Sequence, residues 1–358
     1  MISPNSPIDP AAGTAPNTPR PAHKPVRAAL QLLGFLGGIA LLIWCIAVAL
    51  RPENRDQLAR LRDAKAWEVA ALLGLTAVSL IVNGLSFWSS VRPIRSIAAP
   101  AILATNALAT FLNYLPFKIG ALARIAIHNR RDRLPLLTIG AWFVAMTVLI
   151  TAVLAPLIAA SLWRRTIDNA WWAASITGLI LCYLSVVGLA RTFAGLTGLA
   201  RLHFITTRVG WLWLQRLVGT LAFSQLHRGL SILADAKATA LTMLFRITDI
   251  AVQSLRFVLV AQMIHEPLTF ANAFLAASTY FIIGVLSPAG MLGAREGGTA
   301  ALVSVPASAT LLVGAGEIIV NLIGALIAVT YLRLDKLLRS KPTSSSSSER
   351  PVDLSSMS

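Results

Sequence analysis

The sequence predicts an all-α polytopic membrane protein with about six full transmembrane helices and two oppositely oriented re-entrant hairpins, arranged like an inverted repeat. Hydrophobic residues make up 56% of the 358 residues and charged residues only 13%. Soluble domains average about 25% charged residues. Apolar segments long enough to cross a hydrocarbon core recur along the chain, and two of them are interrupted by Pro and Gly beside basic residues.

The apolar segments divide the chain into one membrane domain between two polar tails. Residues 1–27 are rich in Pro, Ala, Asn and Thr, and residues 341–358 are rich in Ser, so both are predicted to be disordered cytoplasmic tails. Residues 28–340 form the predicted transmembrane domain. Its full spans are expected at residues 28–50, 69–91, 134–163, 171–190, 238–264 and, after Pro306, 307–332.

The basic residues predict the orientation. They precede the first span (Arg20, Lys24, Arg27) and follow the last (Arg333, Lys336, Arg339, Lys341). The positive-inside rule therefore predicts a protein of a bacterial-type inner membrane with both termini in the cytoplasm. The formal net charge of +16 is explained by these flanking residues and by anionic lipid headgroups, so no nucleic-acid partner is expected.

The first interrupted segment is residues 97–133, which contain "NYLPFKIGALAR". Basic residues occur on both sides of its apolar part, which predicts a hairpin that enters and leaves the membrane on the cytoplasmic face. Pro116 and Gly120 form the corner, and Lys118 and Arg124 lie beside it. Because irregular backbone at membrane depth needs polar surroundings, this break predicts a polar cavity. The alternative is an ordinary span followed by snorkelling basic residues.

The second interrupted segment is residues 267–305, with the corner "SPAGMLGAREGG". It contains Pro288, Gly290 and Gly293 just before Arg295. The span before it ends outside and the last span must return to the cytoplasm, so this segment is expected to enter and leave the membrane from outside. Two hairpins that meet near the membrane midplane are a typical transporter binding site. Helix N-termini with Lys118, Arg124 and Arg295 nearby favour an anionic group such as a phosphate or carboxylate.

Charged residues also occur within the predicted spans. Arg246, Asp249, Gln253 and Arg256 follow one another at helical spacing and form a stripe on one helix face. Such residues are expected to face a partner or a cavity rather than lipid, and all are candidates for substrate binding. The alternative is an Arg246–Asp249 pair that neutralises itself and only orients the helix.

The last span contains a second polar pair, Glu317 and Asn321. The expected partner of Glu317 is Arg295 or an arginine of the stripe, in a role that is either structural or coupled to a ligand or proton. Glu296, which follows Arg295, is predicted either to bind the substrate or to cap the helix that begins there.

Signatures of catalysis are missing from the sequence. It contains no Walker loop, no H-E-x-x-H, no G-x-S-x-G and no Cys/His cluster. Cys45 and Cys182 have no paired spacing. We therefore expect neither an enzyme activity nor a metal or other cofactor.

The two interruptions, in this order and separation, resemble the signature breaks of a flippase-like membrane family related to the transmembrane domain of lysylphosphatidylglycerol synthases. The resemblance covers residues 92–332 and is closest at "PAGMLGAREG". The first motif departs from the family, because Ala121 stands where an acidic residue usually follows the Gly, although Arg124 matches. The resemblance implies Glu317 or Asp249 as the acid that compensates.

The resemblance implies translocation or presentation of a lipid with a charged or glycosylated headgroup, without the synthetase domain that some members carry. We therefore expect a lipid translocator whose partner is a membrane lipid with an anionic headgroup. The alternative is a membrane partner or scaffold that holds a separate lipid-modifying enzyme. A membrane glycosyltransferase is a third hypothesis, disfavoured because no outer loop supplies an acidic catalytic pair. A homo-oligomer is compatible with all three.

Overall fold

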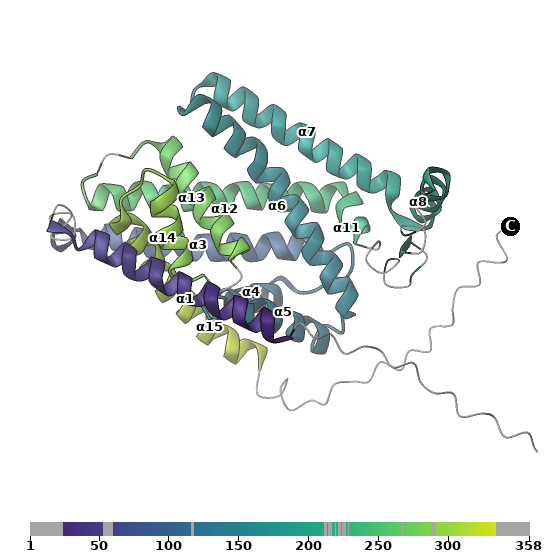
Figure 1. Cartoon of the computed structure of the whole chain (residues 1–358), viewed down its shortest axis with the longest axis horizontal. Helices are drawn as coiled ribbons and strands as arrows, with labels where there is room; N and C mark the ends of the chain where they lie inside the picture. The colour runs from purple at the N-terminus through teal and green to yellow at the C-terminus, as the bar shows by residue number, and fades with distance from the viewer. Residues whose placement is uncertain are drawn as a thin grey trace, which may run out of the picture.

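The computed structural model describes residues 24–52, 60–115, 118–210, 229–266, 268–287 and 291–333, with single residues between 211 and 228. Residues 24–35 are described by their backbone alone. Every regular element in this part of the chain is helical (Figure 1). The elements are α1 (Lys24–Ala49), the short 3-10 helix η2 (Leu61–Asp63), α3 (Ala66–Val91), α4 (Ala99–Leu112), α5 (Ile119–Arg130), α6 (Leu136–Arg164), α7 (Asn169–Phe193), α8 (Gly195–Val209), α11 (Leu230–Ala234), α12 (Ala236–Met263), α13 (Phe270–Leu286), α14 (Ala294–Leu302) and α15 (Ala307–Leu332).

Four of the described helices, α3, α6, α7 and α15, are long and apolar enough to cross a membrane. This agrees with the predicted all-α membrane protein and with four of the six predicted spans. The fifth, α12, has 28 residues but carries the charged stripe. In α1, only the apolar part from Leu36 to Ala49 has described side chains.

Helix starts follow local capping chemistry. The side chains of Asp168, Asp235 and Thr269 accept hydrogen bonds from backbone amides in the first turns of α7, α12 and α13. These bonds satisfy amides that have no partner within the helix. The last helix begins directly after Pro306, as predicted. By contrast, α1 begins at Lys24, so residues 24–27, predicted as tail, are helical. Pro25 is compatible with this start because the first helical turn does not need its amide hydrogen.

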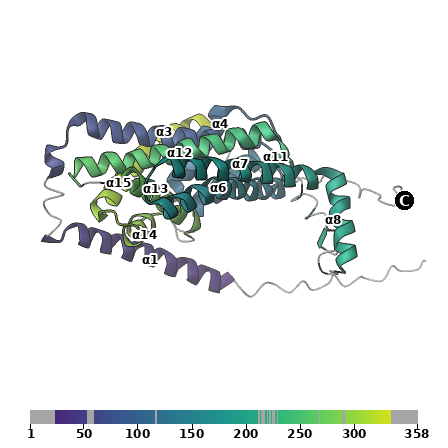
Figure 2. The ribbon, with the colours of Figure 1, turned by 90° about the horizontal axis from the view of Figure 1, so that it is seen from above.

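The long helices lie side by side, whereas α8 runs across one end of the bundle (Figure 2). α8 was not predicted from the sequence, which instead indicates an interfacial amphipathic helix in residues 209–237, where Trp and Leu are mixed with polar residues. Most of residues 211–228 lie outside the described residues.

Both predicted interruptions separate two short helices, α4 from α5 and α13 from α14. The two breaks also contact each other. The backbone amide of Met291 donates to the carbonyl oxygen of Asn113 over 2.9 Å. Lys118 Nζ donates to the carbonyl oxygen of Val285 over 3.0 Å. Pro116, Pro288 and Gly290 lie outside the described residues.

Two glycines at these breaks have steric reasons for being glycine. A Cβ on Gly120 would lie 1.9 Å from the carbonyl oxygen of Ala109, so α5 packs directly on the backbone of α4. Gly293 has a φ of +76°, and its Cβ would lie 2.0 Å from the carbonyl oxygen of Gly38 in α1. Only glycine adopts such a backbone conformation without strain.

Candidate functional site

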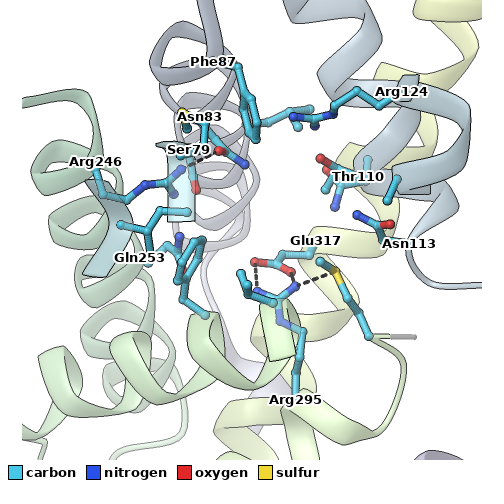
Figure 3. Close-up of a pocket in the computed structure, with 18 of the residues that line it drawn as sticks. Ser79, Asn83, Phe87, Thr110, Asn113, Arg124, Arg246, Gln253, Arg295 and Glu317 are labelled. Atoms are coloured by element: carbon cyan, nitrogen blue, oxygen red, sulfur yellow. Dashed lines mark hydrogen bonds and ion pairs between the residues drawn. The ribbon is translucent and has the colours of Figure 1, made fainter. Parts of the chain in front are cut away.

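A cavity of about 250 Å³ lies where the two breaks meet α3, α6, α12 and α15 (Figure 3). Its charged lining residues are Arg124, Arg246, Arg256, Arg295 and Glu317. Its uncharged polar lining residues are Thr76, Ser79, Asn83, Thr110, Asn113, Thr147, Gln253 and Asn321. The cavity therefore brings together side chains from both interruptions and from the α12 stripe.

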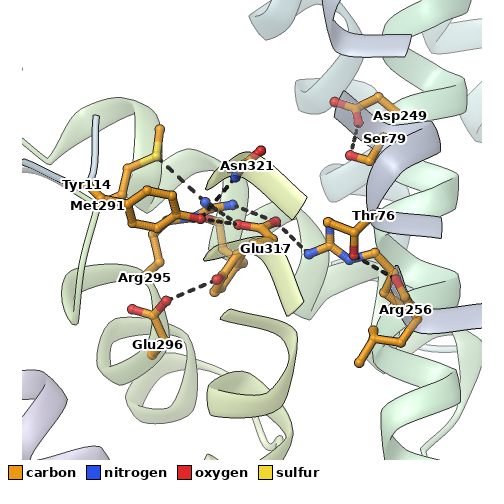
Figure 4. A network of polar contacts seen from close by, with 12 residues as sticks. Thr76, Ser79, Tyr114, Asp249, Arg256, Met291, Arg295, Glu296, Glu317 and Asn321 are labelled. Atoms are coloured by element: carbon orange, nitrogen blue, oxygen red, sulfur yellow. Dashed lines mark hydrogen bonds and ion pairs between the residues drawn. The ribbon is translucent and has the colours of Figure 1, made fainter. Parts of the chain in front are cut away.

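Glu317 is the centre of a buried polar network (Figure 4). Its Oε1 accepts from Arg256 Nη2 over 2.5 Å, and its Oε2 accepts from Arg295 Nη1 over 2.7 Å. Oε2 also accepts from the hydroxyl of Tyr114 over 3.2 Å, and that hydroxyl accepts from Asn321 Nδ2 over 3.2 Å. Both predicted partners, Arg295 and an arginine of the stripe, thus bind Glu317 at once and connect α12 and α14 to α15. Tyr114 connects this network to the first break.

Arg295 is held rigidly next to this carboxylate. Its Nε donates to the carbonyl oxygen of Tyr280 over 3.2 Å, and its guanidinium lies 3.8 Å from the centre of the Tyr280 ring. Gly284 allows this position, because a Cβ there would lie 2.9 Å from Arg295 Cδ. An arginine that is fixed by packing loses little side-chain freedom when it binds a planar anion.

Glu296 has the contacts of a helix cap. Its Oε2 accepts from the backbone amide of Gly293 over 2.8 Å, at the start of α14. Its Oε1 accepts from the Tyr280 hydroxyl over 3.1 Å. Glu296 is buried and does not line the cavity. Of the two predicted roles, this geometry matches capping.

The first two residues of the α12 stripe, Arg246 and Asp249, bond to α3. Arg246 Nη1 binds Asp249 Oδ2 over 2.8 Å, and Asp249 Oδ1 accepts from the Ser79 hydroxyl over 2.6 Å. Arg246 Nη2 donates to Asn83 Oδ1 over 3.0 Å. The predicted self-neutralising pair is therefore present, and the carboxylate of Asp249 is occupied by Arg246. The structure nevertheless also places Arg246 and Gln253 at the cavity wall.

Arg124 differs from the other three arginines. Its side chain is only 7% exposed, and its Nη2 donates to the neutral side chain of Asn106 over 2.6 Å. Its guanidinium lies 3.7 Å from the centre of the Phe87 ring. Among the described residues no carboxylate pairs with it, because Glu317 and Asp249 bind other arginines. Neither acid compensates for Ala121, which lines the cavity in the first break.

The cavity is positively charged as a whole. Four arginines face two carboxylates, Asp249 and Glu317, which leaves a formal excess of two positive charges. Three buried polar atoms at or beside the wall have no hydrogen-bond partner among the described residues: Arg246 Nε, Arg256 Nε and Gln253 Oε1. Buried polar groups are normally hydrogen-bonded, so the cavity wall offers donors and an acceptor to a ligand.

Lys118 was predicted to bind the headgroup, but it has another contact. Its Nζ is bonded to the carbonyl oxygen of Val285, and it does not line the cavity. Its backbone has a φ of +49°, at the N-terminus of α5. The side chain of Lys118 therefore links the first break to the second.

Several site residues were missed from the sequence. Thr76, Ser79, Asn83 and Ser86 repeat on α3 with the same spacing as the α12 stripe, and this matching pattern could have revealed the α3–α12 seam. Asn113 and Tyr114 lie two to three residues before the first Pro and could also have been found. Asn106 and Tyr280 carry no such signal.

No metal site is found within the described ranges, where no three His, Cys, Asp or Glu side chains form a ligand group. Comparisons of the chain with protein-family models, with curated proteins and with solved structures give no match. The assignment therefore depends on the geometry of the cavity itself.

Proposed function

We propose that this protein binds a membrane lipid by its anionic headgroup and moves that headgroup between the two leaflets. The observation that carries the proposal is Arg124, a buried arginine beside the cavity with only neutral partners among the described residues. A charge at membrane depth costs about 2.5–3.5 kcal/mol or more, and such residues mark substrate paths. A phosphate or carboxylate in the cavity would supply the missing charge.

The size of the cavity fits a headgroup rather than a whole lipid. Its volume of about 250 Å³ is slightly below the roughly 300–1,000 Å³ of pockets that enclose whole small ligands. A phosphate with a short polar substituent is small enough to fit, whereas whole acyl or prenyl chains are not. The chains would extend out of the cavity into the bilayer.

The uncharged polar residues favour a headgroup with hydroxyl groups. Gln253 is buried at the wall, and its Oε1 lacks a donor among the described residues. A hydroxyl both donates and accepts, so it fits the Gln253 amide in either orientation. An ammonium group would need a free carboxylate, but Glu317 and Asp249 are occupied by arginines.

The contact between the breaks supports movement as well as binding. Hydrogen bonds from Met291 and Lys118 cross from one broken segment to the other. In transporters built from inverted repeats, separation of such elements opens the site to one side at a time. We accordingly propose the two re-entrant hairpins, the bacterial-type inner membrane and the cytoplasmic termini as the setting of this activity.

Arg124→Gln tests the proposal. It should weaken lipid binding at least about tenfold, since a hydrogen bond to a charged group contributes about 1.5–3 kcal/mol. The protein should still fold, because the change removes a buried charge that lacks a counterion. Binding is measured by native mass spectrometry of the purified protein, and headgroup movement by leaflet exchange in liposomes. Arg201→Gln, an exposed arginine bonded to the Thr192 carbonyl, is the control.

Unchanged lipid binding and exchange in Arg124→Gln, at wild-type abundance, would overturn the proposal. If wild-type protein binds lipid but does not accelerate its exchange, translocation is excluded. The alternative scaffold role for a separate lipid-modifying enzyme then becomes the better reading of the same site.

A further inference from the structure

Two residues that line the cavity also reach the surface of the molecule. Of the 22 lining residues, only Thr147 on α6 and Val285 on α13 are exposed. Both residues thus face the cavity and the outside of the bundle. The edge of the cavity formed by these two exposed residues is called the portal below.

The portal opens at hydrocarbon depth. Thr147 is the twelfth of the 29 residues of α6, one of the helices long and apolar enough to span a membrane. Its neighbours Val144 and Val148 are 58% and 37% exposed, so this part of α6 presents an apolar outer surface. An opening at the middle of a span faces lipid chains, not water.

The two sides of the cavity differ in chemistry. The side chains next to the portal are apolar: Phe143, Met146 and Ile150 from α6, and Phe281 from α13. The charged residues come from other elements, namely α5, α12, α14 and α15. Figure 3 shows Arg124, Arg246 and Arg295 arranged around the space between them. A ligand that satisfies both sides is an amphiphile.

We infer that the portal is the exit through which a hydrocarbon chain of the bound lipid passes from the cavity into the bilayer. The inference rests on the proposed function and specifies it: the ligand carries a phosphate or carboxylate headgroup on at least one long chain. A chain-free anion has no hydrocarbon to place in an apolar opening at this depth, so its binding does not depend on the portal. Lys118, bonded to the carbonyl oxygen of Val285, fixes the start of α5 at one edge of the portal.

Closing the portal should therefore weaken lipid binding without weakening the binding of an anion that has no chain. The test variant is Thr147→Trp with Val285→Trp. The matched control is Val144→Trp with Leu286→Trp, which places the same side chains on exposed positions of the same helices that do not line the cavity. If the test variant does not fold, Thr147→Leu with Val285→Leu closes the portal in part.

The probes are dioleoyl phosphatidylglycerol in detergent micelles and glycerol 3-phosphate, which has the same kind of headgroup without chains. The portal variant should bind the lipid at least about tenfold more weakly, equal to about 1.4 kcal/mol. Its glycerol 3-phosphate binding should equal that of wild type. Arg124→Gln should weaken both, and the control variant should weaken neither.

The outcomes separate the two proposals. Wild-type lipid binding in the portal variant overturns the portal and leaves the headgroup site intact. Equal loss of both probes also overturns it, because the tryptophans would then fill the cavity itself. Loss in the portal variant with none in Arg124→Gln supports the portal and overturns the headgroup site. Wild-type protein that binds glycerol 3-phosphate but no lipid overturns both.

Discussion

Met291 donates its backbone amide hydrogen to the carbonyl oxygen of Asn113, 2.9 Å away, and so joins two helix breaks that are 178 residues apart in the sequence. Each break interrupts a pair of short helices, and each contributes to the wall of the cavity. In the proposed translocation, separation of the two breaks has to break this bond. The joint is therefore the place where a cross-link tests the proposal.

A cross-link at this joint should block lipid movement. Asn113→Cys with Met291→Cys is combined with Cys45→Ala and Cys182→Ala, which remove the two native cysteines. A backbone hydrogen bond brings two Cα atoms into the range of about 4.4–6.8 Å that a disulfide spans. Oxidation should reduce leaflet exchange at least about tenfold, a barrier increase of about 1.4 kcal/mol, and reduction should restore it. Equal exchange by the oxidised and reduced protein would exclude motion at this joint.

Glu317→Gln should strongly destabilise the protein. The change leaves Arg256 and Arg295 buried without their counterion. Breaking a buried ion pair costs about 3–5 kcal/mol. Thermal melting in detergent and protein abundance measure the loss. Asp168→Asn is the control, since it removes the charge of an exposed pair with Arg164 but keeps an acceptor for the α7 amide. Similar melting of the two variants would show that the Glu317 network does not hold the helices.

Gly120→Ala should disturb the first break. The new methyl group would lie 1.9 Å from the carbonyl oxygen of Ala109, so α5 must move away from α4. Overpacking of this kind costs about 1–3 kcal/mol. Because Arg124 lies one turn further along α5, lipid binding should weaken as well. Gly140→Ala, in α6, meets no atom within 4 Å and should leave melting and binding unchanged or slightly improve stability. Equal stability of the two variants would contradict the packing described here.

The two-hairpin topology predicts the sides from which single cysteines can be labelled. Arg95→Cys and Arg130→Cys, before and after the first pair of short helices, should react with an impermeant maleimide from the cytoplasm. His265→Cys and Ser304→Cys, before and after the second pair, should react from outside. All four positions are exposed or next to helix ends, and the variants are made in the cysteine-free background. Labelling of either pair from opposite sides would mean that the segment crosses the membrane.

The helices were predictable where apolar residues form a long run or where a proline marks the end of one element and the start of the next. Apolar runs indicated α3, α6, α7 and α15, and Pro306 marked the start of α15. The amphipathic α8 was missed, because its mixture of Leu, Phe and Arg lacks the long apolar run that identifies a span. The two breaks were predicted from their Pro and Gly residues, and the structure gives the steric reason for Gly120 and Gly293.

The site was predictable as a set of residues but not as a set of contacts. The arginines were found because a charge within an apolar segment is conspicuous, and the pairing of Glu317 with Arg295 or Arg256 followed from charge alone. That neither Asp249 nor Glu317 pairs with Arg124 depends on the distances between helices, and these distances cannot be read from spacing in the sequence. For the same reason, the neutral partner Asn106 and the role of Lys118 at the joint became visible only in the fold.

Glu317 is the last member of its ion-pair network to be synthesised. α12 and α14 are synthesised before α15, so Arg256 and Arg295 reach the membrane before the carboxylate that neutralises them. Until then each carries an insertion penalty of about 2.5–3.5 kcal/mol, which the insertion machinery or a lipid phosphate has to offset. The membrane domain is thus completed from its C-terminal side. A chain truncated before α15 would present two unneutralised guanidinium groups within the bilayer.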